Sequence, residues 1–278
     1  MPRYRPVHPK LIDPAGVQAS AYPRPMGITT DESRAQTVQA TGGQPMVDYQ
    51  GKSNPYNDYQ SIDLLLSLQN PRSEGYDEMG FFVMGQVKEL LFRGLHFELY
   101  NAQQQIKADN VVNALEIFPR ARAFAEFITR SWDVLSTISP EGFNQFRNSL
   151  GAAPGQLSFM YRHVEFILGN KDARRGYVID AAALERDWSQ PYSINASVEQ
   201  AWLQVYKTSG PENDLYRLAE ALVGIADQLS QYRWRHFVSV QRLLGLKPGT
   251  GGSDGVGWLR HVTEHRFFPE LWSIRTQF

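Results

Sequence analysis

The sequence predicts an all-α protein. Apolar residues recur at helical spacing over several long segments, whereas the alternating pattern typical of strands is nearly absent. Residues that begin and end helices flank these segments. The chain has 278 residues, of which 42% are apolar, so it can bury a core in one large domain or in a core plus a small lobe.

The first 52 residues predict an extended arm rather than a domain. They contain seven prolines, little periodicity and few large aliphatic side chains. We therefore divide the chain into an extended N-terminal arm, 1–52, and a helical domain, 53–278.

The helical domain begins with two predicted helices. The first is the short apolar segment SIDLLLSLQ, 61–69. The second covers 78–106 and carries apolar residues around most of its circumference. Such a helix is expected to be buried on most sides.

Three more helices are predicted in the middle of the chain. One covers about 111–138, and another begins at Ser139, which suits the N-cap position. Pro140 and Glu141 then suit the first turn and the positive end of the helix dipole. The third covers 157–169.

The chain between 170 and 212 is polar and broken, which predicts a small peripheral lobe with short helices around 181–188 and 198–206. The last long helix is predicted over about 214–244. Gly245 and Pro248 follow it as the usual signals of a helix end.

Composition excludes several classes of function. The net charge is −1 and no basic patch stands out, so we expect no nucleic-acid partner and no anionic membrane surface. No apolar run reaches the roughly 18 residues of a membrane span, and the N-terminus lacks a signal peptide's apolar core, which predicts a cytoplasmic protein. The absence of cysteine rules out disulfides, thiolate zinc sites, iron–sulfur clusters and thiolate-bound haem.

Six histidines remain as candidate metal ligands. None forms an HExxH pair, so a zinc site built from protein ligands alone is not predicted. A single imidazole suffices where a porphyrin supplies the other four ligands. His163 and His236 both lie on apolar helix faces, and periodicity alone does not choose between them or exclude a hydrogen-bonded core role for either.

Three glycines, Gly80, Gly85 and Gly94, lie inside the predicted helix 78–106. Each costs about 1 kcal/mol of helix stability relative to alanine. Either neighbouring helices pack closely against them, or a flat cofactor or substrate occupies the space of the missing side chains.

Two further features could contact a ligand. The segment LKPGTGGSDGVGW lacks the Lys-Ser/Thr of a phosphate-binding loop, which leaves a mobile flap over a ligand or an ordinary turn. Arg147 follows Phe143 by four residues, and a guanidinium beside an aromatic ring could bind an amino-acid carboxylate. A surface salt bridge is the alternative.

Several segments together resemble the tryptophan 2,3-dioxygenase family of haem-dependent aromatic oxygenases. They occur in family order over nearly all of residues 56–278. They are YNDYQSIDLLLSLQ, YDEMGFFVMGQVKELLFRGLHFEL, SWDVLSTISPEGFNQFRNSLG, YRHVEFILGNK, RWRHFVSVQRLLGLKPGTGGSDGVGWL and FFPELWSIRT.

The resemblance implies a role for individual residues. It makes His236 the proximal ligand of a haem b iron and places Trp132 in the haem pocket. Substrate contacts are implied for six side chains, of which two tyrosines come from a neighbouring subunit of a homotetramer or dimer. The six are Arg147 at the carboxylate, Thr250 at the amino-acid end, Phe81 on the indole, Phe143 beside the arginine, and Tyr56 and Tyr59.

The sequence also departs from the family pattern. Gly85 stands where the family has a distal histidine, which leaves space for substrate or O2. Phe143 replaces a tyrosine, APGQLS at 153–158 replaces SSGFQS, and the region after Lys171 is shorter.

These departures favour a substituted tryptophan, such as a β-methyl derivative, in specialised metabolism. They also leave open the insertion of one oxygen atom to give a 2-oxindole, which would require an external reductant. Ordinary dioxygenation of L-tryptophan to N-formylkynurenine is the alternative, as is a non-catalytic protein that binds haem and an indole amino acid.

Overall fold

The computed structural model describes residues 28–45, 54–151, 155–169, 194–249 and 252–278, and all regular structure in these ranges is helical. The all-α prediction is confirmed. The chain forms two compact units, Met1–Asn70 and Pro71–Phe278. No helix in the described ranges is long and apolar enough to cross a membrane.

The first unit contains α1 (Asp31–Thr41), α2 (Pro55–Gln60) and α3 (Ile62–Ser67). Helix α1 lies inside the stretch predicted to be extended. Thr30 and Ser33 form a capping box that accounts for this local helix, and none of its residues is buried. Ser61 has a φ of 52° and separates α2 from α3, so the predicted helix at 61–69 is shorter and is preceded by another.

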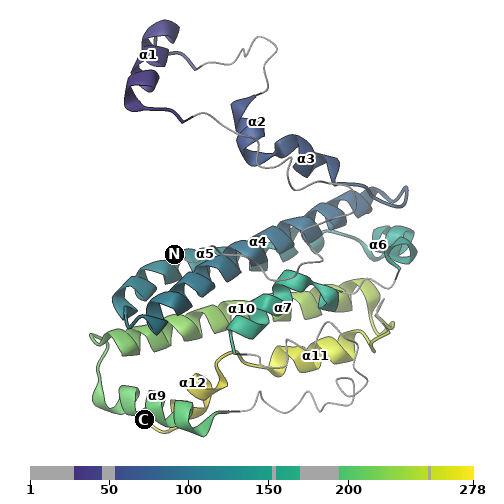
Figure 1. The fold of residues 1–278 in the computed structure, drawn as a ribbon. Coiled ribbons are helices and arrows are strands. Elements are labelled where there is room, and N and C mark those ends of the chain that lie inside the picture. Colours follow the sequence, from purple (N-terminus) through teal and green to yellow (C-terminus); the bar gives the residue numbers. More distant parts are fainter. Residues whose placement is uncertain (1–27, 46–53, 152–154, 170–193, 250–251) are drawn as a thin grey trace. The chain divides into compact units, whose positions relative to one another are not determined.

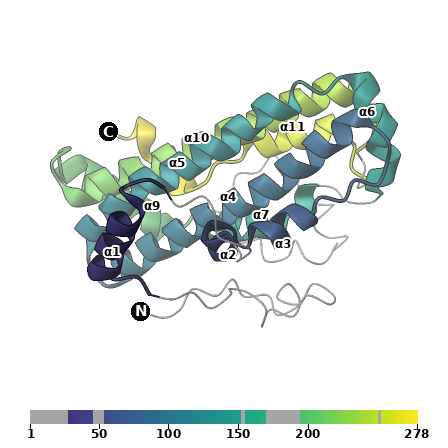
Figure 2. The same ribbon diagram turned by 90° about the horizontal axis from the view of Figure 1, so that it is seen from above.

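The second unit is built on three long helices, α4 (Tyr76–Lys107), α5 (Val111–Leu135) and α10 (Asp214–Leu244). Helix α5 packs against both α4 and α10, which run alongside it (Figures 1 and 2). Their shared core includes Leu95, Ile128 and Leu229, each of which is fully buried.

Shorter helices complete this unit. Helix α7 (Phe159–Ile167) packs on α4, and α11 (Val256–Glu264) packs on α10. Helix α6 (Pro140–Phe146) and the 3-10 turn η3 (Arg147–Leu150) follow α5, and the 3-10 turn η4 (Gly155–Leu157) precedes α7. Ser139 caps α6 by accepting a hydrogen bond from the Gly142 N–H, as its sequence predicts.

The described part of the predicted peripheral lobe is α9 (Ala196–Thr208). Together with α12 (Pro269–Ser273) and the 3-10 turn η6 (Ile274–Thr276), it forms a small separate core against α10. That core contains Leu203, Tyr206, Ala219, Leu271 and Ile274. The helix predicted at 181–188 lies outside the described residues.

Candidate functional site

His236 lies on α10 and faces α5. Its imidazole stacks on the indole of Trp132, with ring centroids 4.6 Å apart and an interplanar angle of 16°. Burial lowers the pKa of His236 to about 3, and the positive charge of Lys88 contributes to this shift. The imidazole is therefore neutral at physiological pH, which is the form that binds a metal.

His163, the alternative ligand considered from sequence, lies in a different environment. It lies on α7, and the centroid of its ring is 4.4 Å from that of Phe159 and 5.5 Å from that of His96. Among the described residues, no group of three or more histidines and carboxylates could hold a metal ion. An iron at either histidine would therefore need ligands from a macrocycle.

Trp132 carries a buried polar atom that lacks a partner among the described residues. Its side chain is 7% exposed, and its Nε1 donates no hydrogen bond to any of them. Buried N–H groups are rarely left unpaired, because each costs about 1–3 kcal/mol. An unpaired indole N–H beside a neutral imidazole fits a site that a bound group completes.

Lys88 approaches the same indole from α4. Its Nζ lies 4.3 Å from the centroid of the Trp132 ring, a cation–π contact. Burial lowers the pKa of Lys88 to about 8, and the neighbouring Glu89 carboxylate opposes the shift. Sequence analysis missed this residue, although it lies three positions after Gly85 on the same predicted helix.

The glycines of α4 have different environments. A Cβ at Gly94 would lie 2.5 Å from the Phe124 ring of α5, so close helix packing explains this glycine. A Cβ at Gly80 or Gly85 would meet no atom within 4 Å. The open space beside Gly85 is compatible with the hypothesis of an adjacent cofactor or substrate.

Aromatic side chains gather where α4 meets α6. The ring of Phe81 lies 6.1 Å from that of Phe143 and 5.3 Å from that of Phe146. Phe143 and Phe146 are buried, at 6% and 0% exposure. The predicted substrate residues Phe81 and Phe143 are therefore close to each other.

Arg147 directly follows this aromatic cluster. Helix α6 ends at Phe146, so Arg147 begins the 3-10 turn η3 rather than extending the helix face that it was predicted to share with Phe143. Its Nη2 donates to the Pro248 carbonyl at 2.5 Å. This bond joins η3 to the glycine-rich segment after α10.

The described part of the glycine-rich segment forms a tight turn. The Gly249 N–H donates to the Ser253 carbonyl at 3.0 Å. Gly255 has a φ of 71°, and a Cβ there would lie 2.7 Å from the Lys247 carbonyl oxygen. Turn geometry therefore explains both glycines. Thr250, the predicted substrate ligand, lies outside the described residues.

Tyr56 and Tyr59 lie on α2, in the first unit. Their side chains are 67% and 71% exposed. Both are available for contact with another molecule, and their predicted role at a neighbouring subunit's site remains a proposal.

A buried ion pair one turn before His236 was not anticipated from sequence. Arg233 and Glu165 are 3% and 2% exposed, and their closest nitrogen and oxygen are 2.7 Å apart. Arg233 also donates to the Tyr161 hydroxyl at 2.9 Å and to the His265 carbonyl at 3.2 Å. This network fixes α10 against α7 and the segment that follows α11.

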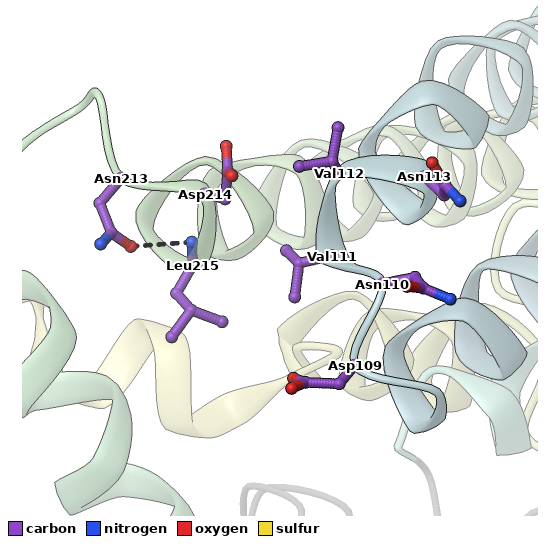
Figure 3. A pocket seen from close by; sticks show the side chains of 8 residues that line it. All are labelled: Asp109, Asn110, Val111, Val112, Asn113, Asn213, Asp214 and Leu215. Carbon is purple, nitrogen blue, oxygen red and sulfur yellow. Dashed lines mark hydrogen bonds between the residues drawn. The ribbon is translucent and has the colours of Figure 1, made fainter.

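One surface pocket lies away from these residues. Figure 3 shows it at the start of α5 and the start of α10, lined by residues 109–113 and 213–215. The Asn213 side chain there accepts a hydrogen bond from the Leu215 N–H at 2.9 Å, as an ordinary N-cap does. None of the predicted site residues lines this pocket.

An all-α domain with a neutral imidazole, an unpaired indole N–H and an open helix face has the features expected of a helical haem-dependent oxygenase. The family model for tryptophan 2,3-dioxygenase matches residues 41–180 and 192–278. The chain belongs to the tryptophan 2,3-dioxygenase family, whose members use haem and O2.

Similar proteins from several bacteria are named tryptophan 2,3-dioxygenase. The tryptophan 2,3-dioxygenase of Ralstonia pickettii is 37% identical over 276 aligned residues, which cover 86% of this chain and 99% of the relative. That of Bacillus cereus strain ATCC 10987 is 38% identical over 256 residues, covering 80% and 92%. That of Cupriavidus necator is 37% identical over 259 residues, covering 81% and 88%.

Proposed function

We propose that this protein is a haem-dependent dioxygenase that cleaves the indole C2–C3 bond of L-tryptophan or a closely related indole amino acid. The observation that carries the proposal is the neutral, partly buried imidazole of His236 beside the Trp132 N–H, which has no partner among the described residues. The names of the relatives favour insertion of both oxygen atoms. They lend no support to the mono-oxygenation that the sequence departures suggested.

In this proposal His236 holds the haem iron, and Trp132 lies in the haem pocket. The bound haem supplies the binding and activation of O2. Both oxygen atoms enter the substrate as the C2–C3 bond breaks and two carbonyl groups form. The overall reaction therefore needs no external reductant.

The protein's own residues bind and orient the amino acid. Arg147 has five N–H donors in a planar fork, so it can bind a carboxylate with one edge while it keeps the Pro248 carbonyl. Phe81 and Phe143 supply apolar surface for the indole, and Thr250 is proposed to contact the amino-acid end. Fixing the substrate in this way favours reaction by proximity and orientation.

We also propose a homo-oligomer, a tetramer or a dimer, in which Tyr56 and Tyr59 complete a neighbouring subunit's site. The exposure of both tyrosines supports this proposal. Replacing both with serine should raise KM for tryptophan while leaving hemin binding intact. Unchanged kinetics would remove these tyrosines from the proposed site.

A second candidate substrate is a tryptophan with an added substituent. The open space beside Gly85 favours this candidate, because a distal histidine would fill that space. Comparing kcat/KM for L-tryptophan and β-methyltryptophan decides between the two substrates.

The reaction is tested with hemin-reconstituted, reduced protein exposed to 18O2 and L-tryptophan. Dioxygenation adds about 36 mass units to the substrate, and mono-oxygenation adds about 18 and depends on a reductant. We expect the larger increase without added reductant during turnover. Hemin binding without turnover of any indole would instead support the non-catalytic binding protein.

A further inference from the structure

We propose that Lys88 is a cofactor-binding residue whose ammonium group pairs with a carboxylate of the porphyrin. This inference rests on the proposed function. It adds Lys88 to the proposed haem pocket as a positively charged residue, which the family resemblance did not identify.

The position of Lys88 along α4 places it on the same helix face as two residues of the proposed site. Phe81, Gly85 and Lys88 follow one another at spacings of four and three residues, so they share one helix face. At about 1.5 Å of rise per residue, Lys88 lies about 10 Å along that face from Phe81. The face thus has an aromatic end at Phe81, open space at Gly85, and a cation at Lys88.

Contacts join Lys88 to the proposed haem ligand. Its Nζ lies 4.3 Å from the Trp132 ring centroid, and that ring stacks on His236 at 4.6 Å. The two rings and the ammonium group come from three different helices: α5, α10 and α4. A porphyrin on His236 would therefore lie near this ammonium group.

Lys88 has no hydrogen bond or ion pair within the described part of the chain. The adjacent carboxylate, Glu89, accepts hydrogen bonds from the Ser158 hydroxyl and, at 3.4 Å, from the Met160 N–H of α7. A partly buried cation without a direct ion pair is costly, and the charge of Glu89 offsets the desolvation of Lys88 only in part. A carboxylate on the bound group would supply that ion pair.

The porphyrin is a better source of this carboxylate than the amino-acid substrate. Arg147 already offers a carboxylate site next to Phe143 and Phe146, which contact Phe81 at the other end of the α4 face. Lys88 instead lies beside the two residues proposed to hold the cofactor. Haem b carries two carboxylates, so one can pair here.

The test compares hemin with hemin dimethyl ester, which lacks free carboxylates. Each porphyrin is titrated into apoprotein and binding is followed by the Soret absorption. Lys88→Met should weaken hemin binding about 10- to 100-fold, the range of a charge-assisted hydrogen bond, and leave the dimethyl ester's Kd unchanged. Lys88→Arg should keep hemin affinity within a few-fold of the wild type.

Lys107→Met is the matched control, since Lys107 is an exposed lysine on the same helix. It should bind both porphyrins like the wild type. Lys88→Gln provides a second neutral variant if Lys88→Met does not fold, as judged by far-UV circular dichroism. Lys88→Gln should show the same loss of affinity for hemin and no loss of affinity for the dimethyl ester.

Three outcomes would overturn the inference while leaving the proposed function intact. The first is an unchanged hemin Kd in both neutral variants. The second is an equal loss for both porphyrins, which would indicate packing rather than charge. The third is unchanged hemin binding with a raised KM for tryptophan but not for tryptamine, which would assign Lys88 to the substrate carboxylate. Failure of the wild type to bind hemin would overturn both proposals.

Discussion

At the scale of single residues, the proposed chemistry depends on groups whose polar atoms are free to meet a ligand. His236 is neutral because of burial, and the Trp132 N–H has no partner in the part of the chain that the structure describes. Arg147 uses one nitrogen for the Pro248 carbonyl and has further donors. These groups form few bonds with one another, as expected where a cofactor and a substrate complete the site.

Replacing Arg147 with alanine should leave hemin binding unchanged and lower kcat/KM for tryptophan by about 10- to 100-fold, equivalent to roughly 1.5–3 kcal/mol. The loss follows from removing a charge-assisted hydrogen bond to the carboxylate. Steady-state kinetics with tryptophan and tryptamine measures it. Tryptamine lacks the carboxylate, so an equal loss for tryptamine would contradict this role.

At the scale of elements, the second unit depends on how α4, α7 and α10 are held together. Gly94 lets α4 approach α5 closely, and the Arg233–Glu165 pair joins α10 to α7. His236 lies one turn after Arg233, so this pair fixes the part of α10 that carries the proposed iron ligand.

Two glycines of α4 should respond in opposite ways to alanine. Gly85→Ala should stabilise the apoprotein by about 0.5–1 kcal/mol, because alanine favours helix and its Cβ meets open space. Gly94→Ala should destabilise it by about 1–3 kcal/mol, because the Cβ would clash with Phe124. Urea unfolding followed by circular dichroism measures both changes, and a loss of stability in Gly85→Ala would show that its surroundings are already filled.

Breaking the buried ion pair should be costly. Glu165→Gln leaves Arg233 buried without its anion, so we expect a loss of about 3–5 kcal/mol in the free energy of unfolding. Glu126→Gln removes the exposed pair with Arg122 and should cost about 0.5 kcal/mol or less. Equal effects in the two variants would contradict a special role for the buried network.

At the scale of the whole molecule, the long helices were predictable and the site was only partly so. The sequence predicted helices at 78–106 and 214–244, which agree closely with α4 and α10, because apolar periodicity over many residues is a strong signal. Helix α1 was missed because a local capping box, rather than burial, accounts for it. Lys88 and Glu165 were missed because their importance depends on which helices meet.

Stability of the apoprotein should fall as the pH falls below about 6.5. Burial, with a smaller contribution from His163, lowers the pKa of His96 to about 4. The folded state therefore binds fewer protons than the unfolded state between these two values, and His236 acts in the same direction. Each histidine contributes a slope of up to about 1.4 kcal/mol per pH unit.

Denaturant unfolding at several pH values between 7 and about 4.5 measures this dependence. The variant His96→Asn should show a shallower decline than the wild type. An identical decline in both proteins would show that His96 does not cause it.

The central claim is that His236 ligates a haem iron, and hemin titration of the apoprotein tests it most directly. We predict a Soret band for the wild type and for His163→Ala, and loss of stable haem binding in His236→Ala. A His236→Ala variant that binds hemin as tightly as the wild type, with an unchanged spectrum, would contradict the claim.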